Sequence, residues 1–76
     1  MTMHDEALAM KIKSTLASDK RMSNLPIEVR VSGSEVFLKG KVDSPEQVDC
    51  VHFMVSGVAG VRSVNADELE IREEGR

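Results

Sequence analysis

Val36-Phe37-Leu38-Lys39-Gly40-Lys41-Val42, followed at once by Asp43-Ser44-Pro45-Glu46-Gln47, is the stretch that decides the fold. Apart from Phe37, its first seven residues alternate between apolar and polar, the period-two pattern of a strand with one covered face. The residues after it start a helix. Ser44 is a good N-cap for free backbone N–H groups, Pro45 fits the first helical position, and Gln47 completes a capping box. The stretch therefore predicts a strand that passes directly into a helix.

The residues before this stretch predict its hairpin partner. Residues 27–31 alternate in the same way, with Ile, Val and Val at the odd positions. Ser32-Gly33-Ser34-Glu35 then forms a two-residue loop with Gly33 at its first central position, as a type II′ turn prefers. With Ser32 opposite Glu35, Val29 and Val31 share one face with Val36 and Leu38. Gly40 then lies opposite Ile27, where the missing side chain indicates close approach of a helix backbone or a bulky side chain.

A first helix is expected from Asp5 to about Asp19. Its apolar residues recur every four positions and form one stripe: Leu8, Ile12 and Leu16. Asp5 and Glu6 lie at the positive end of the helix dipole, where acidic side chains are favourable.

The second helix is expected from Pro45 to about Val58, with a stripe of valines on one side and Gly60 as its exit. A last strand follows from near Val61 to Ile71. Even spacing along it misses Leu69 by one position, so a bulge near Asp67-Glu68 is expected. Residues 72–76 are expected to form a frayed tail.

Together these elements predict one α/β (α+β) domain over residues 1–76, with its core from about residue 5 to residue 71. The order is helix-strand-strand-helix-strand, with two helices packed on one face of a three-stranded mixed sheet. The helical crossover makes the last strand parallel to the second. Whether that strand lies beside the second or the first strand is left open by the sequence.

Composition narrows the classes of partner. The chain has 76 residues, two Phe, no Trp or Tyr and a net charge of −3. It lacks the aromatic platform of single-stranded nucleic-acid binders and weakly repels a phosphate backbone. Gly57-Val58-Ala59-Gly60 is a G-x-x-G string, but it joins a helix to a strand and carries no basic residue, unlike the loop of KH domains. No nucleic-acid partner is expected.

Catalytic and metal chemistry are not expected either. The soft ligands are His4, Cys50 and His52, and the last two are two positions apart on a helix, so they do not share a face. No nucleophile, base and orienting group can be assembled, so we expect no enzyme, no metal and no cofactor. The N-terminus lacks a secretory apolar run, and no apolar span could cross a membrane. This predicts a cytoplasmic protein as written, with an envelope location open if the chain was trimmed.

The sheet face opposite the helices carries the best candidate site. It is expected to expose Arg30, Phe37, Lys39 and Lys41, cations beside one apolar side chain. Such a face suits an anionic lipid headgroup or an acidic protein partner. The plainer alternatives are that Phe37 only packs across the strands and that Glu28 pairs with Lys39 on a merely soluble face.

In its order of elements, and in Val-x-Leu-x-Gly-x-Val at 36–42, Ser-Pro at 44–45 and Gly-Val-x-x-Val at 60–64, the chain resembles the BON domain. Gly40 and Gly60 match the two characteristic glycines of that family. The family often has Asn-Gly or Asp-Gly one position later in the hairpin, and here the pair is Gly33-Ser34. The likeness implies a non-catalytic module that binds phospholipid surfaces or mediates contacts within envelope proteins.

Two functional hypotheses follow. The first is a binding module that docks through its open sheet face or a strand edge onto a phospholipid surface or a protein partner. The second is a self-association domain, a homo-oligomer in which an exposed edge strand pairs with a neighbour.

Overall fold

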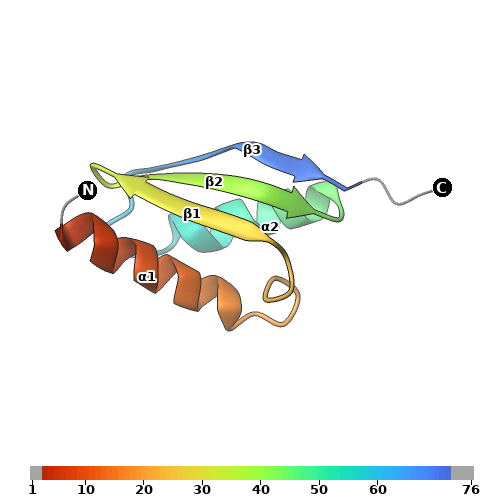
Figure 1. The fold of residues 1–76 in the computed structure, drawn as a ribbon, viewed down its shortest axis with the longest axis horizontal. Coiled ribbons are helices and arrows are strands. Elements are labelled where there is room, and N and C mark those ends of the chain that lie inside the picture. The colour runs from red at the N-terminus through yellow and green to blue at the C-terminus, as the bar shows by residue number, and fades with distance from the viewer. Residues whose placement is uncertain (1–2, 73–76) are drawn as a thin grey trace.

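The computed structural model describes residues 3–72 and confirms the expected α+β architecture (Figure 1). The elements follow in the order α1 (Met3–Ala17), β1 (Ile27–Ser32), β2 (Glu35–Val42), α2 (Pro45–Ser56) and β3 (Ser63–Ile71). Both helices lie on one face of the sheet, as Figure 1 shows. The other face is left uncovered by any element of the described chain.

The sheet order is β1-β2-β3, so the question left open by the sequence is answered: β3 lies beside β2. β1 pairs with β2 antiparallel, and β3 pairs with β2 parallel after the crossover through α2. The predicted register is confirmed, with Ser32 opposite Glu35 and Ile27 opposite Gly40. β1 and β3 are therefore the two edge strands.

The core lies between the sheet and the helices and is aliphatic. The predicted stripe of α1 is buried, and so are Val29 and Val31 of β1 and the even positions of β2 other than Gly40. The main core side chains are Leu8, Ile12, Leu16, Met22, Val29, Val31, Val36, Leu38, Val51, Val55 and Leu69. Burial of aliphatic surface is the main force that holds these five elements together.

Both helices differ slightly from their predicted ends. α1 is shifted by two residues toward the N-terminus, and α2 ends at Ser56 instead of near Val58. Gly57 keeps a right-handed helical φ of −83°, while Gly60 has φ +98° and makes the exit before β3. Val61 was expected in the last strand but lies two residues before it.

The start of α2 corrects the predicted capping box. The Ser44 side chain makes no capping hydrogen bond. Instead, the Gln47 side-chain Oε1 accepts a hydrogen bond of 2.6 Å from the backbone N–H of Asp43, one residue before the cap. The Gln47 N–H donates to the backbone carbonyl of Ser44 at 3.1 Å. Gln47 therefore closes the turn between β2 and α2, with Pro45 at the first helical position as predicted.

The β1–β2 turn corrects the predicted type. Gly33 has φ +58° and Ser34 has φ +69°, so both central residues are left-handed. This is the pattern of a type I′ turn, whereas a type II′ turn requires positive φ at the first residue alone. Both turns connect the strands in the same register, which is why the pairing was predicted correctly although the turn was not.

Gly40 also has a different neighbour from the one expected. A Cβ at this position would lie 2.0 Å from the carbonyl oxygen of Pro26, and the residue has φ +147°. The close neighbour is the backbone of the connector before β1, not a helix or a bulky side chain. The Lys41 N–H donates to the same Pro26 carbonyl at 3.4 Å, so the glycine lets the start of β1 lie tightly on β2.

The expected bulge in β3 lies within one residue of its predicted place. Asn65 pairs with Phe37 and Glu68 pairs with Lys39, so Ala66 and Asp67 together face the single residue Leu38. The Asp67 N–H donates to Asn65 Oδ1 at 2.9 Å, which supports the irregular backbone. Beyond the bulge, Leu69 returns to the covered face and is buried.

The C-terminal end of the sheet continues to Arg72. Its N–H donates to the carbonyl of Val42 at 2.6 Å, and its guanidinium pairs with Asp43 at 3.0 Å. Residues 73–76 of the expected frayed tail lie outside the described residues.

Candidate binding surface

The four side chains proposed from the sequence lie together on the open face of the sheet. Arg30 of β1 is the cross-strand partner of Phe37, and Lys39 and Lys41 follow along β2. All four are exposed, and Phe37 keeps 39% of its surface in contact with solvent. We call this surface, with the β3 residues Asn65, Glu68 and Glu70 beside it, the open face.

β3 changes the electrostatics of the open face. Lys39 lies between Glu28 of β1 and Glu68 of β3, and Lys41 lies next to Glu70. Because β3 is the neighbour of β2, each of these lysines has an acidic residue opposite it. The open face is therefore a ladder of alternating charges and not a basic patch.

Ion pairing on this face differs from the alternative in which Glu28 pairs with Lys39. Glu28 is the register partner of Lys39, but its carboxylate lies 3.6 Å from Arg30 Nε along the same strand. Both side chains of this pair are well exposed, so it contributes little to stability. A broad hollow runs beside it, lined by Arg30, Phe37, Lys39, Asn65 and Glu68 among others.

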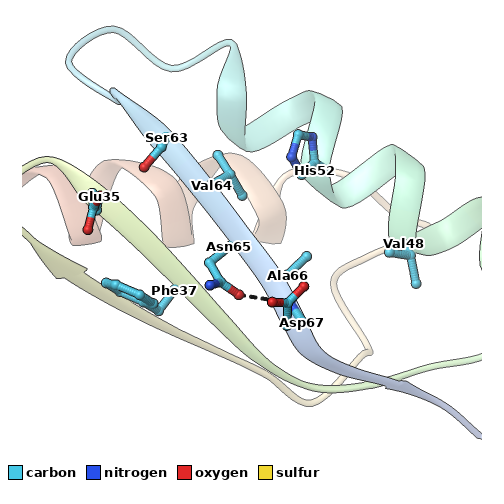
Figure 2. A pocket seen from close by; sticks show the side chains of 9 residues that line it. All are labelled: Glu35, Phe37, Val48, His52, Ser63, Val64, Asn65, Ala66 and Asp67. Atoms are coloured by element: carbon cyan, nitrogen blue, oxygen red, sulfur yellow. Dashed lines mark hydrogen bonds between the residues drawn. The ribbon is translucent and has the colours of Figure 1, made fainter.

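A second hollow lies at the outer edge of β3 (Figure 2). On the helix side it is bordered by Val48 and His52 of α2, with Val64 and Ala66 of β3 turned toward them. On the other side of the strand lie Phe37 and Asn65. Sequence reasoning missed this groove because it forms only when β3 occupies the edge next to α2.

The helical side carries a further apolar surface that was not predicted. Phe53 is 78% exposed and Met10 is 69% exposed. Phe53 contributes to a groove between the helices together with Lys11, Thr15 and Val58. The sequence feature that could have predicted this surface is the position of Phe53, which lies off the valine stripe of α2.

Asp5 has a structural role that dipole reasoning did not anticipate. It is 4% exposed, and its carboxylate accepts hydrogen bonds from the N–H groups of Gly33 at 3.2 Å and Ser34 at 3.4 Å. The same turn approaches His4, whose Nε2 lies 3.5 Å from Ser34 Oγ. α1 is thereby tied to the tip of the hairpin.

Soft and titratable groups elsewhere lie apart. Arg21 donates side-chain hydrogen bonds to Asp19, which hold the pKa of Asp19 below its usual value and raise the pKa of Arg21. Arg21 Nη2 also lies 3.6 Å from Cys50 Sγ. Within residues 3–72, no three His, Cys, Asp or Glu side chains are grouped closely enough to hold a metal ion. No helix in that range is long and apolar enough to span a membrane.

Comparison with known proteins gives a match over nearly the whole chain. The model of the family described as BON domain matches residues 4–73. An uncharacterized protein of Deinococcus radiodurans is 30% identical over 66 residues, which cover 87% of this chain and 26% of that protein. This chain thus spans about a quarter of the length of that relative.

Proposed function

Because the chain belongs to the BON domain family, a family of non-catalytic binding modules, we propose that this domain binds a protein partner through the open face of its sheet. One observation carries the proposal: Phe37 lies half-exposed on the central strand, between Arg30 and Asn65, with charged residues of both signs along the same face. Aromatic and arginine side chains are the commonest anchors of protein interfaces.

The charge pattern favours a protein over a membrane. Attraction to anionic lipid depends on an excess of Lys and Arg near the surface, each worth about 1 kcal/mol. Here Lys39 and Lys41 are each opposed by a glutamate of β3, and the chain as a whole carries −3. A protein surface can instead complement both signs, which gives specificity and register.

Photo-crosslinking tests the proposal. In cells that express the protein, Phe37 is replaced by the photoreactive residue benzoylphenylalanine. This residue keeps an aromatic ring at position 37, and its side chain extends further from the backbone. We expect a discrete protein adduct after irradiation. Arg30→Glu/Lys41→Glu should remove that adduct, because the reversed charges no longer match the partner. The same photoreactive residue at Phe53, on the helical side, is the matched control.

A parallel measurement distinguishes the lipid alternative. Purified protein labelled with ¹⁵N is titrated with vesicles of phosphatidylcholine alone and of phosphatidylcholine mixed with phosphatidylglycerol. Salt-sensitive signal changes at Arg30, Phe37, Lys39 and Lys41 with the anionic vesicles would overturn the protein proposal in favour of a phospholipid surface. Crosslinks at Phe53 but not at position 37 would show that the helical side is the docking surface.

A further inference from the structure

β3 presents backbone groups away from the sheet near its C-terminal end. The N–H of Arg72, the residue after β3, donates to the carbonyl of Val42 at the end of β2. Successive backbone groups of a strand point to opposite sides. The N–H and C=O groups of Leu69 and Ile71 therefore point outward from the edge. Such a row is a template for an added strand.

The second edge strand is less available. On β1 the Ile27 N–H donates to the Leu25 carbonyl at 2.9 Å, and the Gly33 N–H just beyond the strand donates to Asp5. Both ends of that edge are thus closed by bonds within the chain. β1 is also the shorter strand, with six residues against nine in β3.

The charges on the open face indicate which charged side chains a fourth strand would need. The row through Glu28, Lys39 and Glu68 alternates in sign across the three strands, and the row of Lys41 and Glu70 alternates in the same way. Each row ends at β3 with a glutamate. A strand added next to β3 would continue both rows if it placed a cation opposite each glutamate, at two positions that are two residues apart.

The groove of Figure 2 lies beside Ala66, before Glu68, and it bears on the helix-side residues of the added strand at that level. Alternate side chains of an added strand would point to the helix side, where Val48 and His52 border the groove beside Ala66. Near the end of the strand, Ile71 is 44% exposed and lies at the same edge. These neighbours favour apolar side chains on that side of the added strand.

We propose that the outer edge of β3 binds an extended basic segment of a partner protein, in which Lys or Arg alternates with apolar residues, as a fourth strand of the sheet. This site is separate from the anchor on the open face and does not depend on it. A second copy of the same edge is a poorer occupant. Antiparallel pairing about Leu69 would set Glu68 and Glu70 of one copy against Glu70 and Glu68 of the other.

Peptide titration tests the site. The probe is a short synthetic peptide of valine alternating with lysine or arginine, added to ¹⁵N-labelled protein and followed by NMR and by amide hydrogen exchange. We expect salt-sensitive signal changes along β3 and at Val48 and His52, with slower exchange at the Leu69 and Ile71 amides. A peptide of the same composition with its basic residues in one block, and one with glutamate in place of the cations, should bind about tenfold more weakly or worse.

Two variants separate the backbone and charge contributions. Ile71→Pro removes an N–H that points outward, so it should abolish peptide binding while the bonds between β2 and β3 are kept. Glu68→Lys/Glu70→Lys should weaken binding of the basic peptide at least about tenfold and allow the acidic peptide to bind. Glu28→Lys, which changes an acid on the far strand, is the control that keeps binding.

Several outcomes would overturn the proposal. These are equal binding of the blocked and alternating peptides, signal changes confined to Arg30 and Lys41, or no change at millimolar peptide. Protection of the β3 edge that grows with protein concentration in the absence of peptide would identify a second copy as the occupant instead. An intact edge site together with a failed crosslink at position 37 would reject the open-face function and leave this inference standing.

Discussion

The carboxylate of Asp5 bonds both central amides of the β1–β2 turn, although 28 residues separate it from Gly33. A buried carboxylate is tolerated only when its oxygens accept hydrogen bonds. Here the bonds also hold the first turn of α1 against the tip of the hairpin. Local sequence reasoning placed Asp5 only with respect to the helix dipole, because nothing within α1 indicates that the turn lies beside it.

Asp5→Ala should therefore cost about 2 kcal/mol of unfolding free energy, the usual scale for losing hydrogen bonds to a charged group at a buried position. Urea unfolding measures this cost. Glu6→Ala is the control, since Glu6 is exposed in the same turn of the helix. Equal costs for the two substitutions would show that the turn does not depend on Asp5.

Ser34 shows why the turn type could not be predicted from four residues. A left-handed φ costs a non-glycine residue about 1 kcal/mol or more. Ser34 adopts it because its N–H is bonded to Asp5 and its carbonyl accepts the Arg62 N–H at 2.9 Å. Both partners come from distant parts of the chain. The family's usual Asn-Gly or Asp-Gly pair suits a type I′ turn, whereas Gly33-Ser34 forms it under tertiary constraint.

Gly33→Asn/Ser34→Gly should consequently stabilise the protein by about 1 kcal/mol, because Asn-Gly is the preferred pair of a type I′ turn. A Cβ at position 33 meets no atom within 4 Å, so there is space for the Asn side chain. The midpoint of urea unfolding should rise with an unchanged slope. A lower midpoint would contradict the type I′ geometry.

Among the elements, the start of α2 gives a direct test of the corrected cap. Because the Ser44 side chain makes no capping bond, Ser44→Ala should cost less than about 0.5 kcal/mol. Gln47→Ala removes the acceptor of the Asp43 N–H and should cost about 1 kcal/mol. The unfolding free energies of the two variants show whether Gln47 or Ser44 stabilises the start of α2. The reverse order of costs would restore the capping box predicted from the sequence.

Packing of β1 on β2 depends on the absence of a side chain at position 40. Gly40→Ala should destabilise by about 3 kcal/mol or more, since its Cβ would overlap the Pro26 carbonyl and its φ of +147° disfavours any L-residue. Gly57→Ala is the matched control. Its φ is in the helical range, and the nearest atoms to its Cβ lie at 3.6 Å, so stability should be kept or slightly raised. Thermal or urea unfolding of both variants checks the contrast.

Most of what was predicted correctly about the individual strands and helices came from the spacing of their apolar residues. The alternation around Val29 and Leu38 was sufficient for strand type, register and the covered face, because one buried face allows only one register. The one-residue excess before Leu69 was sufficient for the bulge. The neighbour of Gly40 could not be predicted, since it belongs to the connector before β1. The helix ends differ from prediction by about two residues, the usual precision of a sequence pattern.

At the scale of the whole molecule, the candidate site was predicted only in part. Arg30, Phe37, Lys39 and Lys41 do share one exposed face, because strand alternation determines the face of each residue. Their acidic neighbours were missed for a different reason. The sequence left the place of β3 open, and only its position beside β2 puts glutamates opposite Lys39 and Lys41. Because β3 lies beside β2, the open face carries charges of both signs and not the basic patch expected from the sequence.

Glu68 and Glu70 of β3 also affect self-association of the chain. If two copies paired antiparallel through β3 about Leu69, Glu68 and Glu70 would make two like-charge contacts across the interface. Each such contact is unfavourable by about 0.7 kcal/mol, so the two together weaken pairing about tenfold. Glu68→Gln/Glu70→Gln should remove this penalty and raise the self-association constant by about that factor, measured by sedimentation equilibrium at low salt. Glu6→Gln/Glu46→Gln changes the net charge equally but alters the helices, where both residues are exposed, and should leave association unchanged. An equal rise in both variants would mean that net charge, and not the β3 edge, keeps the copies apart.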